Sequence, residues 1–117
     1  MKLEKQLISF YQQSKIYEIT LAESKELKRS AKRLPKAKTY NIALIQEAVD
    51  HQIWTEKCSA RLERIGKELF ERRIKITRVL SAIGLPARVT ISVAYEQVGN
   101  IDFWYENMDL HFKEMEQ

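Results

Sequence analysis

The residues best suited to chemistry in this sequence are cations rather than catalytic groups. The stretch KELKRSAKRLPKAKTY, residues 25–40, contains seven lysines and arginines and one acid. Steps of three and four residues place side chains on one face of a helix. The segment before Pro35 therefore predicts a ridge of like charges, and further cations extend it past a turn. The predicted nucleic-acid-binding residues of this stretch are Lys25, Lys28, Arg29, Lys32, Arg33, Lys36 and Lys38.

This basic stretch is difficult to explain by folding alone. Like charges at i,i+4 destabilise a helix by a few tenths of a kcal/mol per pair. Cations spaced about 5–6 Å apart can instead displace counterions from successive phosphates. Among these cations we find no aromatic platform for single strands and no motif that enters the major groove. The stretch predicts binding of RNA or DNA by charge and shape, with a steep dependence on salt.

A second basic set follows later in the chain. Glu63, Glu68 and Glu71 are interleaved with it. Two interpretations stay open: a solvated face held by i,i+4 ion pairs, or a second part of the nucleic-acid surface. Its candidate binding residues are Arg61, Arg64, Arg72, Arg73, Lys75 and Arg78.

Catalytic signals are weak. Glu47 and His51 have the four-residue spacing of a metal pair, but no second such pair completes a site. Cys58 lies on an apolar stripe and is interpreted as a small core residue. Three glycines spread over the chain form no phosphate-binding loop. We expect no catalytic residue, no metal site, no cofactor and no enzymatic activity.

Charge is distributed unevenly along the chain. Residues 1–88 contain 19 of the 20 basic residues and ten acids, whereas residues 89–117 contain one lysine and six acids. The acidic end also contains Phe103 and Trp104, and two alternatives stay open for them on a helix: one is exposed as an interface anchor, or a neighbouring helix covers them. The alternative function is therefore a protein-interaction module, a small subunit or inhibitor that uses an acidic aromatic C-terminal helix.

Apolar periodicity predicts an all-helical protein. Spacings of three and four residues indicate helices, here at 3–33, 39–55, 58–83 and 88–115, and such amphipathic helices pack as an antiparallel four-helix bundle. The pattern leaves two alternatives open. The second and third helices form one continuous helix if no break occurs near 53–59, and the VGNI sequence at 98–101 is typical of a hairpin turn. Gly84 suits a left-handed helix cap.

The bulk composition bounds the protein class. The chain has 117 residues, 44% of them hydrophobic, which suits a single domain with a modest core. One cysteine fits a reducing compartment. We see no signal peptide and no apolar run long enough to span a membrane. The expectation is a cytoplasmic protein with no membrane partner.

The sequence LPKAKTYNI after a long amphipathic helix, and YEQVGNIDFW further on, resemble a known group of proteins. These are the ribosomal-RNA intervening-sequence proteins and the accessory variability determinants of diversity-generating retroelements. Pro35, Tyr40, Gly99 and Trp104 carry the resemblance. It implies a basic four-helix bundle that forms a pentameric ring, binds RNA or DNA and docks on a reverse transcriptase. One departure is the acidic end of this chain, because the accessory proteins usually end basic.

Overall fold

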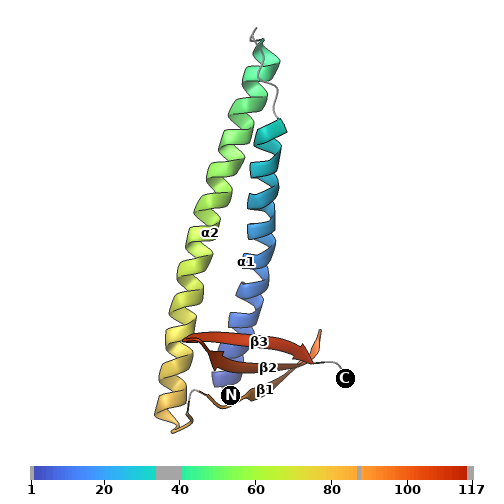
Figure 1. Cartoon of the computed structure of the whole chain (residues 1–117). Coiled ribbons are helices and arrows are strands. Elements are labelled where there is room, and N and C mark those ends of the chain that lie inside the picture. The colour runs from blue at the N-terminus through green and yellow to red at the C-terminus, as the bar shows by residue number, and fades with distance from the viewer. Residues whose placement is uncertain (1, 34–40, 87, 116–117) are drawn as a thin grey trace. The chain divides into compact units, whose positions relative to one another are not determined.

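The computed structural model describes residues 2–33, 41–86 and 88–115. Two long helices precede three strands in the chain (Figure 1). The prediction of an all-helical four-helix bundle is therefore wrong, and the protein belongs to the α+β class. Neither helix in these ranges is long and apolar enough to cross a membrane. The elements are α1 (Lys2–Arg33), α2 (Ile42–Ala82), β1 (Ile91–Tyr95), β2 (Gly99–Glu106) and β3 (Asp109–Met115).

Helix α2 is continuous where a break was predicted near 53–59. It begins after Asn41, whose Oδ1 accepts a hydrogen bond from the Leu44 amide at 2.9 Å. This is an N-cap, which satisfies one of the free amides of the first turn. No glycine or proline interrupts the chain until Gly66, so helical propensity continues across the predicted break. Gly84, with φ 77°, follows the helix and confirms the predicted left-handed cap.

The described residues divide into two compact units. The first unit combines 1–14 with 67–117, and the second unit consists of 15–66. Each helix contributes one part to each unit. The first unit therefore holds the sheet with one end of each helix, and the second is a helical hairpin.

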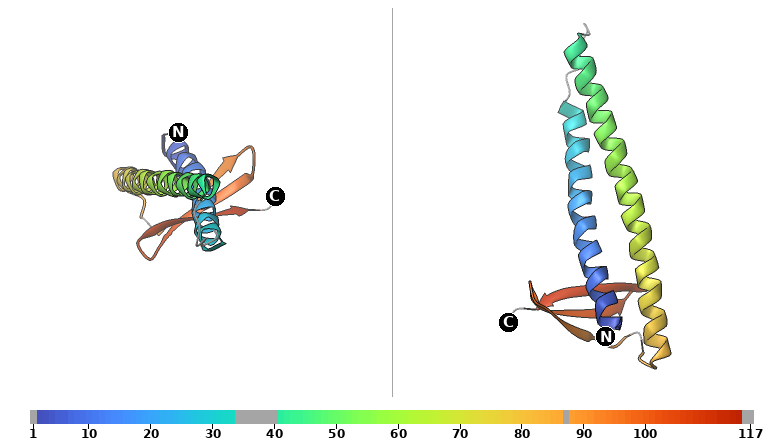
Figure 2. Two further views of the ribbon diagram at one scale, coloured as in Figure 1. Left: turned by 90° about the horizontal axis from the view of Figure 1, so that it is seen from above. Right: turned by 180° about the vertical axis from the view of Figure 1, so that it is seen from behind.

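The three strands form one antiparallel sheet in the order β1-β2-β3 (Figure 2). Val93 pairs with Ile101, and Phe103 pairs with Ile91 on one side and with Phe112 on the other. The predicted helix at 88–115 is therefore wrong, and the hairpin alternative describes its first part. The turn lies at 96–98 rather than at 98–101, because Gly99 and Asn100 already belong to β2. A second hairpin then adds β3.

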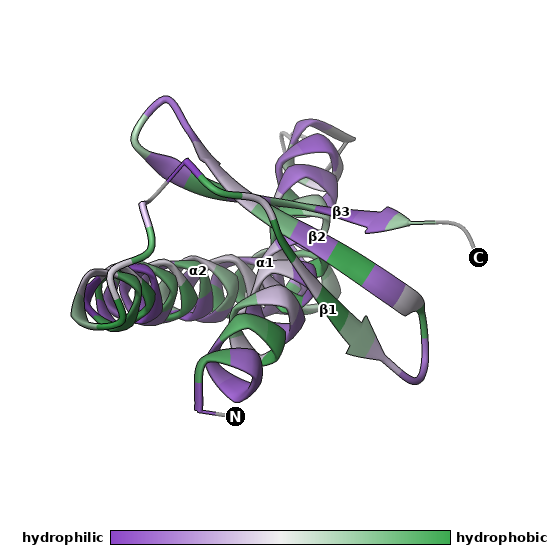
Figure 3. Ribbon diagram, turned by 90° about the horizontal axis from the view of Figure 1, so that it is seen from below, coloured by the Kyte–Doolittle hydropathy of each residue, from purple (hydrophilic) through white to green (hydrophobic). Residues whose placement is uncertain are grey.

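Two periodicities compete in this C-terminal segment. The 3-4 spacing that predicted a helix included Ala94, Met108 and Met115, all of which are exposed. The buried positions instead alternate along each strand, as at Ile101 and Phe103. Hydrophobic and hydrophilic residues alternate visibly along β2 (Figure 3). A sheet covered on one face by helices requires that period of two, and the helical spacing was coincidental.

The two turns explain how a segment with few glycines forms hairpins. Between β1 and β2, the Val98 amide donates to the Tyr95 carbonyl at 3.1 Å, and Gly99 follows with φ 91°. Between β2 and β3, Asn107 and Met108 have φ values of 52° and 64°. Two residues with positive φ match the twist of antiparallel strands, as in a type I′ turn. The sequence Asn-Met gave a weak signal because glycine usually occupies the second position.

The core of the first unit lies between the sheet and the two helix ends. Its aromatic part joins Phe10 and Tyr11 of α1 to Phe112 of β3, with ring centroids 6.4 and 5.1 Å apart. The Tyr11 hydroxyl also donates a hydrogen bond to the Glu114 carboxylate. The hydroxyl of Thr77 on α2 and that of Tyr105 on β2 lie 2.5 Å apart. The buried cluster consists of Leu3, Leu7, Phe10, Tyr11, Ile76, Leu80, Val93, Ile101, Phe103 and Leu110.

The second unit is held by a narrow contact between antiparallel helices. Cys58 of α2 and Thr20 of α1 are buried, and the Cys58 thiol lies 3.5 Å from the Thr20 carbonyl. Ile65 is only 2% exposed. A further apolar set of α2, whose spacing of three and four residues predicts a buried face, lies on the exposed side instead. Its members are Ile42, Ile45, Val49 and Ile53, with exposed fractions between 43% and 87%.

Candidate nucleic-acid interface

The predicted basic ridge lies on α1 within the second unit. Lys25, Lys28, Arg29 and Lys32 are all exposed. At 100° per residue they share an arc of about 100°, and a rise of 1.5 Å per residue spreads them over about 10 Å. Arg33 ends α1, whereas Lys36 and Lys38 lie outside the described residues. The structure therefore keeps the helical part of the predicted ridge together on one face.

The lysines of this ridge lack acidic neighbours. Lys28 has serine, lysine and alanine among its i±3 and i±4 neighbours, and no acid. Lys25 likewise has leucine, alanine, lysine and arginine at these positions. Among the described residues, Lys25, Lys28 and Lys32 form no ion pair, whereas Arg29 pairs with Glu26 at 3.4 Å. The ridge is therefore a row of three unneutralised ammonium groups beside one weakly held guanidinium.

The two basic sets do not meet within the second unit. Arg61 of α2 forms an ion pair with Glu23 of α1 at 3.6 Å. Glu23 lies about 170° around α1 from the middle of the ridge, by the helical angle per residue. Arg61 therefore approaches α1 on the side away from Lys28. The structure separates the ridge from the basic residues of α2 in this unit.

Arg61 and Arg64 share their face of α2 with an aromatic residue, Trp54, whose helical spacing to Cys58 predicts a core position. Trp54 is 62% exposed, and the Lys57 ammonium lies 5.8 Å from the centre of its ring. A shallow depression of about 410 Å³ follows, lined by Lys57, Ala60, Arg61 and Arg64. The sequence signal that could have identified this face is spacing. Intervals of three, four and three residues separate Trp54, Lys57, Arg61 and Arg64.

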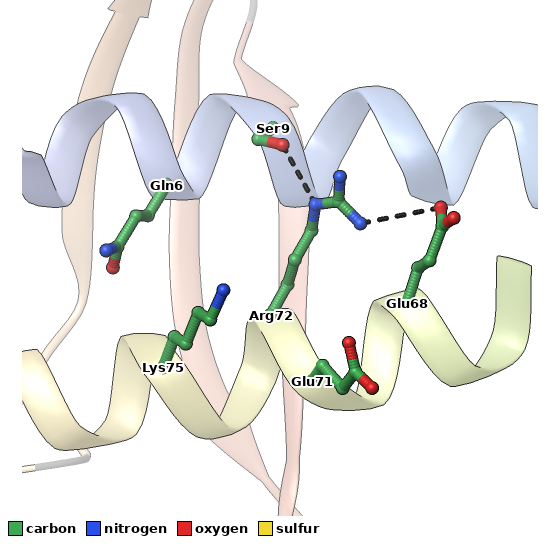
Figure 4. Close-up of a pocket in the computed structure, with 6 residues that line it drawn as sticks. All are labelled: Gln6, Ser9, Glu68, Glu71, Arg72 and Lys75. Carbon is green, nitrogen blue, oxygen red and sulfur yellow. Dashed lines mark hydrogen bonds and ion pairs between the residues drawn. The ribbon is translucent and has the colours of Figure 1, made fainter.

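The basic residues of α2 in the first unit are engaged in structural contacts. The Arg72 guanidinium donates to the Ser9 hydroxyl at 2.9 Å and pairs with Glu68 at 3.6 Å (Figure 4). Arg73 donates to the Met108 carbonyl and pairs with Asp109 at 3.2 Å, which ties α2 to the β2–β3 turn. These two arginines fit the interpretation of a face held by ion pairs.

The cavity beside Arg72 is close to electrically neutral. It has a volume of about 410 Å³ and is lined by Gln6, Ser9, Glu68, Glu71, Arg72 and Lys75 (Figure 4). Its two cations are matched by two carboxylates, so a phosphate would gain little there. Arg78 is exposed on the same part of α2.

The predicted protein-interface residues lie on β2, not on a helix. Phe103 is 1% exposed and belongs to the core cluster. Trp104 is half-buried, stacks on His111 with centroids 5.9 Å apart, and its indole nitrogen donates to Glu106 at 3.3 Å. The acidic aromatic helix that the alternative function required is therefore replaced by a sheet.

The residues considered for metal or nucleophilic chemistry have structural contacts. His51 Nε2 lies 2.8 Å from the Leu27 carbonyl, and since a carbonyl oxygen only accepts, the imidazole is the donor. That contact joins the two helices of the second unit. Cys58 is buried. The described residues contain no group of three or more histidine, cysteine or acidic side chains placed to hold a metal.

Comparisons of the chain with protein-family models, curated proteins and solved structures found no match.

Proposed function

We propose that this protein binds nucleic acid through the α1 ridge, by charge and without reading base sequence. One observation carries the proposal: Lys25, Lys28 and Lys32 are exposed, share one helix face and have no ion pair among the described residues. An unneutralised row of cations gains more from a polyanion than an ion-paired face does.

The chemistry of the ridge defines the kind of binding. Successive lysines are separated by rises of about 4.5 and 6 Å along the helix axis, within reach of successive phosphates of one strand. The ridge residues include no aromatic and no amide side chain that would contact bases. Binding through phosphates alone is tolerant of sequence and weakens as salt rises, because released counterions provide its free energy.

A matched pair of triple variants tests the proposal. K25Q/K28Q/K32Q removes three ridge charges, and K2Q/K5Q/K67Q removes three exposed lysines elsewhere, so both variants have the same net charge. Binding of labelled RNA and DNA duplexes is measured by fluorescence anisotropy over a range of salt concentrations. We expect the ridge variant to lower affinity more than tenfold and to reduce the salt slope by about 3, because each phosphate contact contributes about 1.

The control variant separates the effect of the ridge from the effect of net charge. The control should retain most of the affinity and nearly the original salt slope, since its lysines lie off the ridge. Equal losses in both variants would mean that net charge alone governs binding, and this would contradict the assignment to the ridge. Unchanged binding in both would exclude the ridge as the binding surface, and no binding by the unaltered protein would remove the function itself.

A ring oligomer and a reverse-transcriptase partner remain predictions that rest on the family resemblance. Pro35 and Tyr40, which carry part of that resemblance, lie outside the described residues. Gly99 and Trp104 lie on β2, not on the helix that the family pattern implies. Light scattering of the purified protein tests the ring, and a monomer under all conditions would remove it.

A further inference from the structure

A second surface of the helical hairpin combines an exposed aromatic ring with cations. Trp54, Lys57, Arg61 and Arg64 fall within an arc of about 80° on α2 and extend over about 15 Å of its axis. Trp54 is 62% exposed. A tryptophan that stabilises a hairpin is normally buried, so the core of the second unit does not explain this one.

The contacts of this surface leave the ring and its three cations accessible. Lys57 lies over the Trp54 ring at 5.8 Å, a weak cation–π contact at an exposed site. Arg61 pairs with Glu23 at 3.6 Å, but both side chains are about half exposed, and such pairs are readily exchanged for another anion. Arg64 forms no ion pair among the residues that the structure describes.

The depression beside the ring completes the arrangement. Ala60 provides a small side chain between Lys57, Arg61 and Arg64, and the hollow that they line has a volume of about 410 Å³. Asp50 is the acid one helical turn before Trp54, and its carboxylate accepts a hydrogen bond from Gln46 at 2.8 Å. The surface therefore presents an aromatic ring followed by three cations and a shallow groove.

We propose that this surface, the Trp54 face, binds single-stranded nucleic acid, with a base stacked on the indole and phosphates held by Lys57, Arg61 and Arg64. Stacking requires an unpaired base, because the faces of paired bases in a duplex are covered by their neighbours. Every base has a stacking face, so the contact is tolerant of sequence. An uncharged protein partner would leave three desolvated cations without anions, which favours the nucleic acid.

This inference extends the proposed function from duplex shape to single strands, and it does not depend on the α1 ridge. The ridge lies on the far side of α1 from the Arg61 contact, as the pairing with Glu23 requires. The two surfaces are therefore testable one at a time.

Intrinsic fluorescence provides the test, because the chain contains two tryptophans and W104F leaves Trp54 as the single reporter. Oligo(dT) of roughly 15 nucleotides, longer than the contact of a single ring, is titrated into this variant. We expect strong quenching that weakens with salt. The matched control is an abasic strand with the same phosphates, which should bind without comparable quenching because it has no base to stack.

Substitutions then separate stacking from charge. In anisotropy measurements on labelled strands, W54L should lower the affinity for oligo(dT) about tenfold, because stacking on one ring contributes about this much. Its affinity for the abasic strand should be unchanged. K57Q/R64Q should lower the affinity for both strands. F70L removes another exposed aromatic of α2, one covered by Arg73 at 5.0 Å, and should change neither.

The outcomes distinguish failure of this inference from failure of the proposed function. Equal quenching by the abasic strand, or an unchanged oligo(dT) affinity in W54L, would overturn the Trp54 face and leave the ridge unaffected. The ridge variant K25Q/K28Q/K32Q should retain Trp54 quenching by oligo(dT), and loss of that quenching would overturn the independence of the two surfaces. Quenching by an acidic peptide but not by oligo(dT) would assign the face to a protein partner.

Discussion

Two isoleucines of α2 provide the sharpest test of the fold, because each belongs to an apolar set with the three- and four-residue spacing that predicts a buried helix face. Ile65 is 2% exposed and Ile53 is 43% exposed, although both lie on the same helix within the second unit. I65A and I53A make the same chemical change at these two positions. Their difference in stability therefore reports which side of α2 faces α1.

The magnitudes follow from burial. Each substitution removes three carbon groups, equivalent to about 2.4 kcal/mol when fully buried at about 0.8 kcal/mol each. At Ile65 a cavity adds to this loss, and we expect about 3–4 kcal/mol. At Ile53 about half of the side chain is already in water, no cavity forms, and alanine gains about 0.4 kcal/mol of helix propensity. We expect I53A to cost about 1 kcal/mol or less.

Urea unfolding followed by far-UV circular dichroism measures both values. Equal losses of unfolding free energy, or a larger loss in I53A, would refute the assignment of the faces. Ile53 would then be a buried core residue. The experiment should be run at low and at high protein concentration. A loss at Ile53 that appears only at high concentration would mean that a second copy of the chain covers the stripe of Ile42, Ile45, Val49 and Ile53.

Two further predictions concern the ends of elements. N41A should destabilise the protein by about 1 kcal/mol in urea unfolding, because the Leu44 amide loses its cap, and N41D should retain most of that stability. M108G should instead stabilise it by about 0.5–1 kcal/mol in thermal unfolding, since Met108 has φ 64° and is 93% exposed. A destabilised M108G would show that the methionine side chain has a packing role.

The helical part of the candidate site was predictable from the sequence, and its surroundings were not. Steps of three and four residues placed Lys25, Lys28 and Lys32 together without any tertiary information, because helical geometry alone fixes that arrangement. The roles of Arg72 and Arg73 depended on Ser9 and Asp109, which are distant in the chain. Only folding brings such partners together, so sequence spacing could not separate held cations from free ones.

Trp54 shows the same limit for apolar residues. Its spacing to Cys58 and Ile65 fits a buried stripe, and both of those residues are buried. A narrow hairpin contact covers only the centre of that stripe, however, and Trp54 at its edge remains in water. The width of the neighbouring element decides this, and the width is not encoded in a spacing pattern.

The sequence by itself determined α1, the cap at Gly84 and the ridge of cations, since each depends on residues within a few positions of one another. The tertiary structure decided the C-terminal third. Residues 91–115 fit a helical and an alternating pattern, and the described residues of the helix ends supply an apolar face that a sheet can cover. Strand pairing between positions such as Phe103 and Phe112 is non-local. Strand pairing stabilises the protein only when the strands and helices come into contact, so local propensity does not predict it.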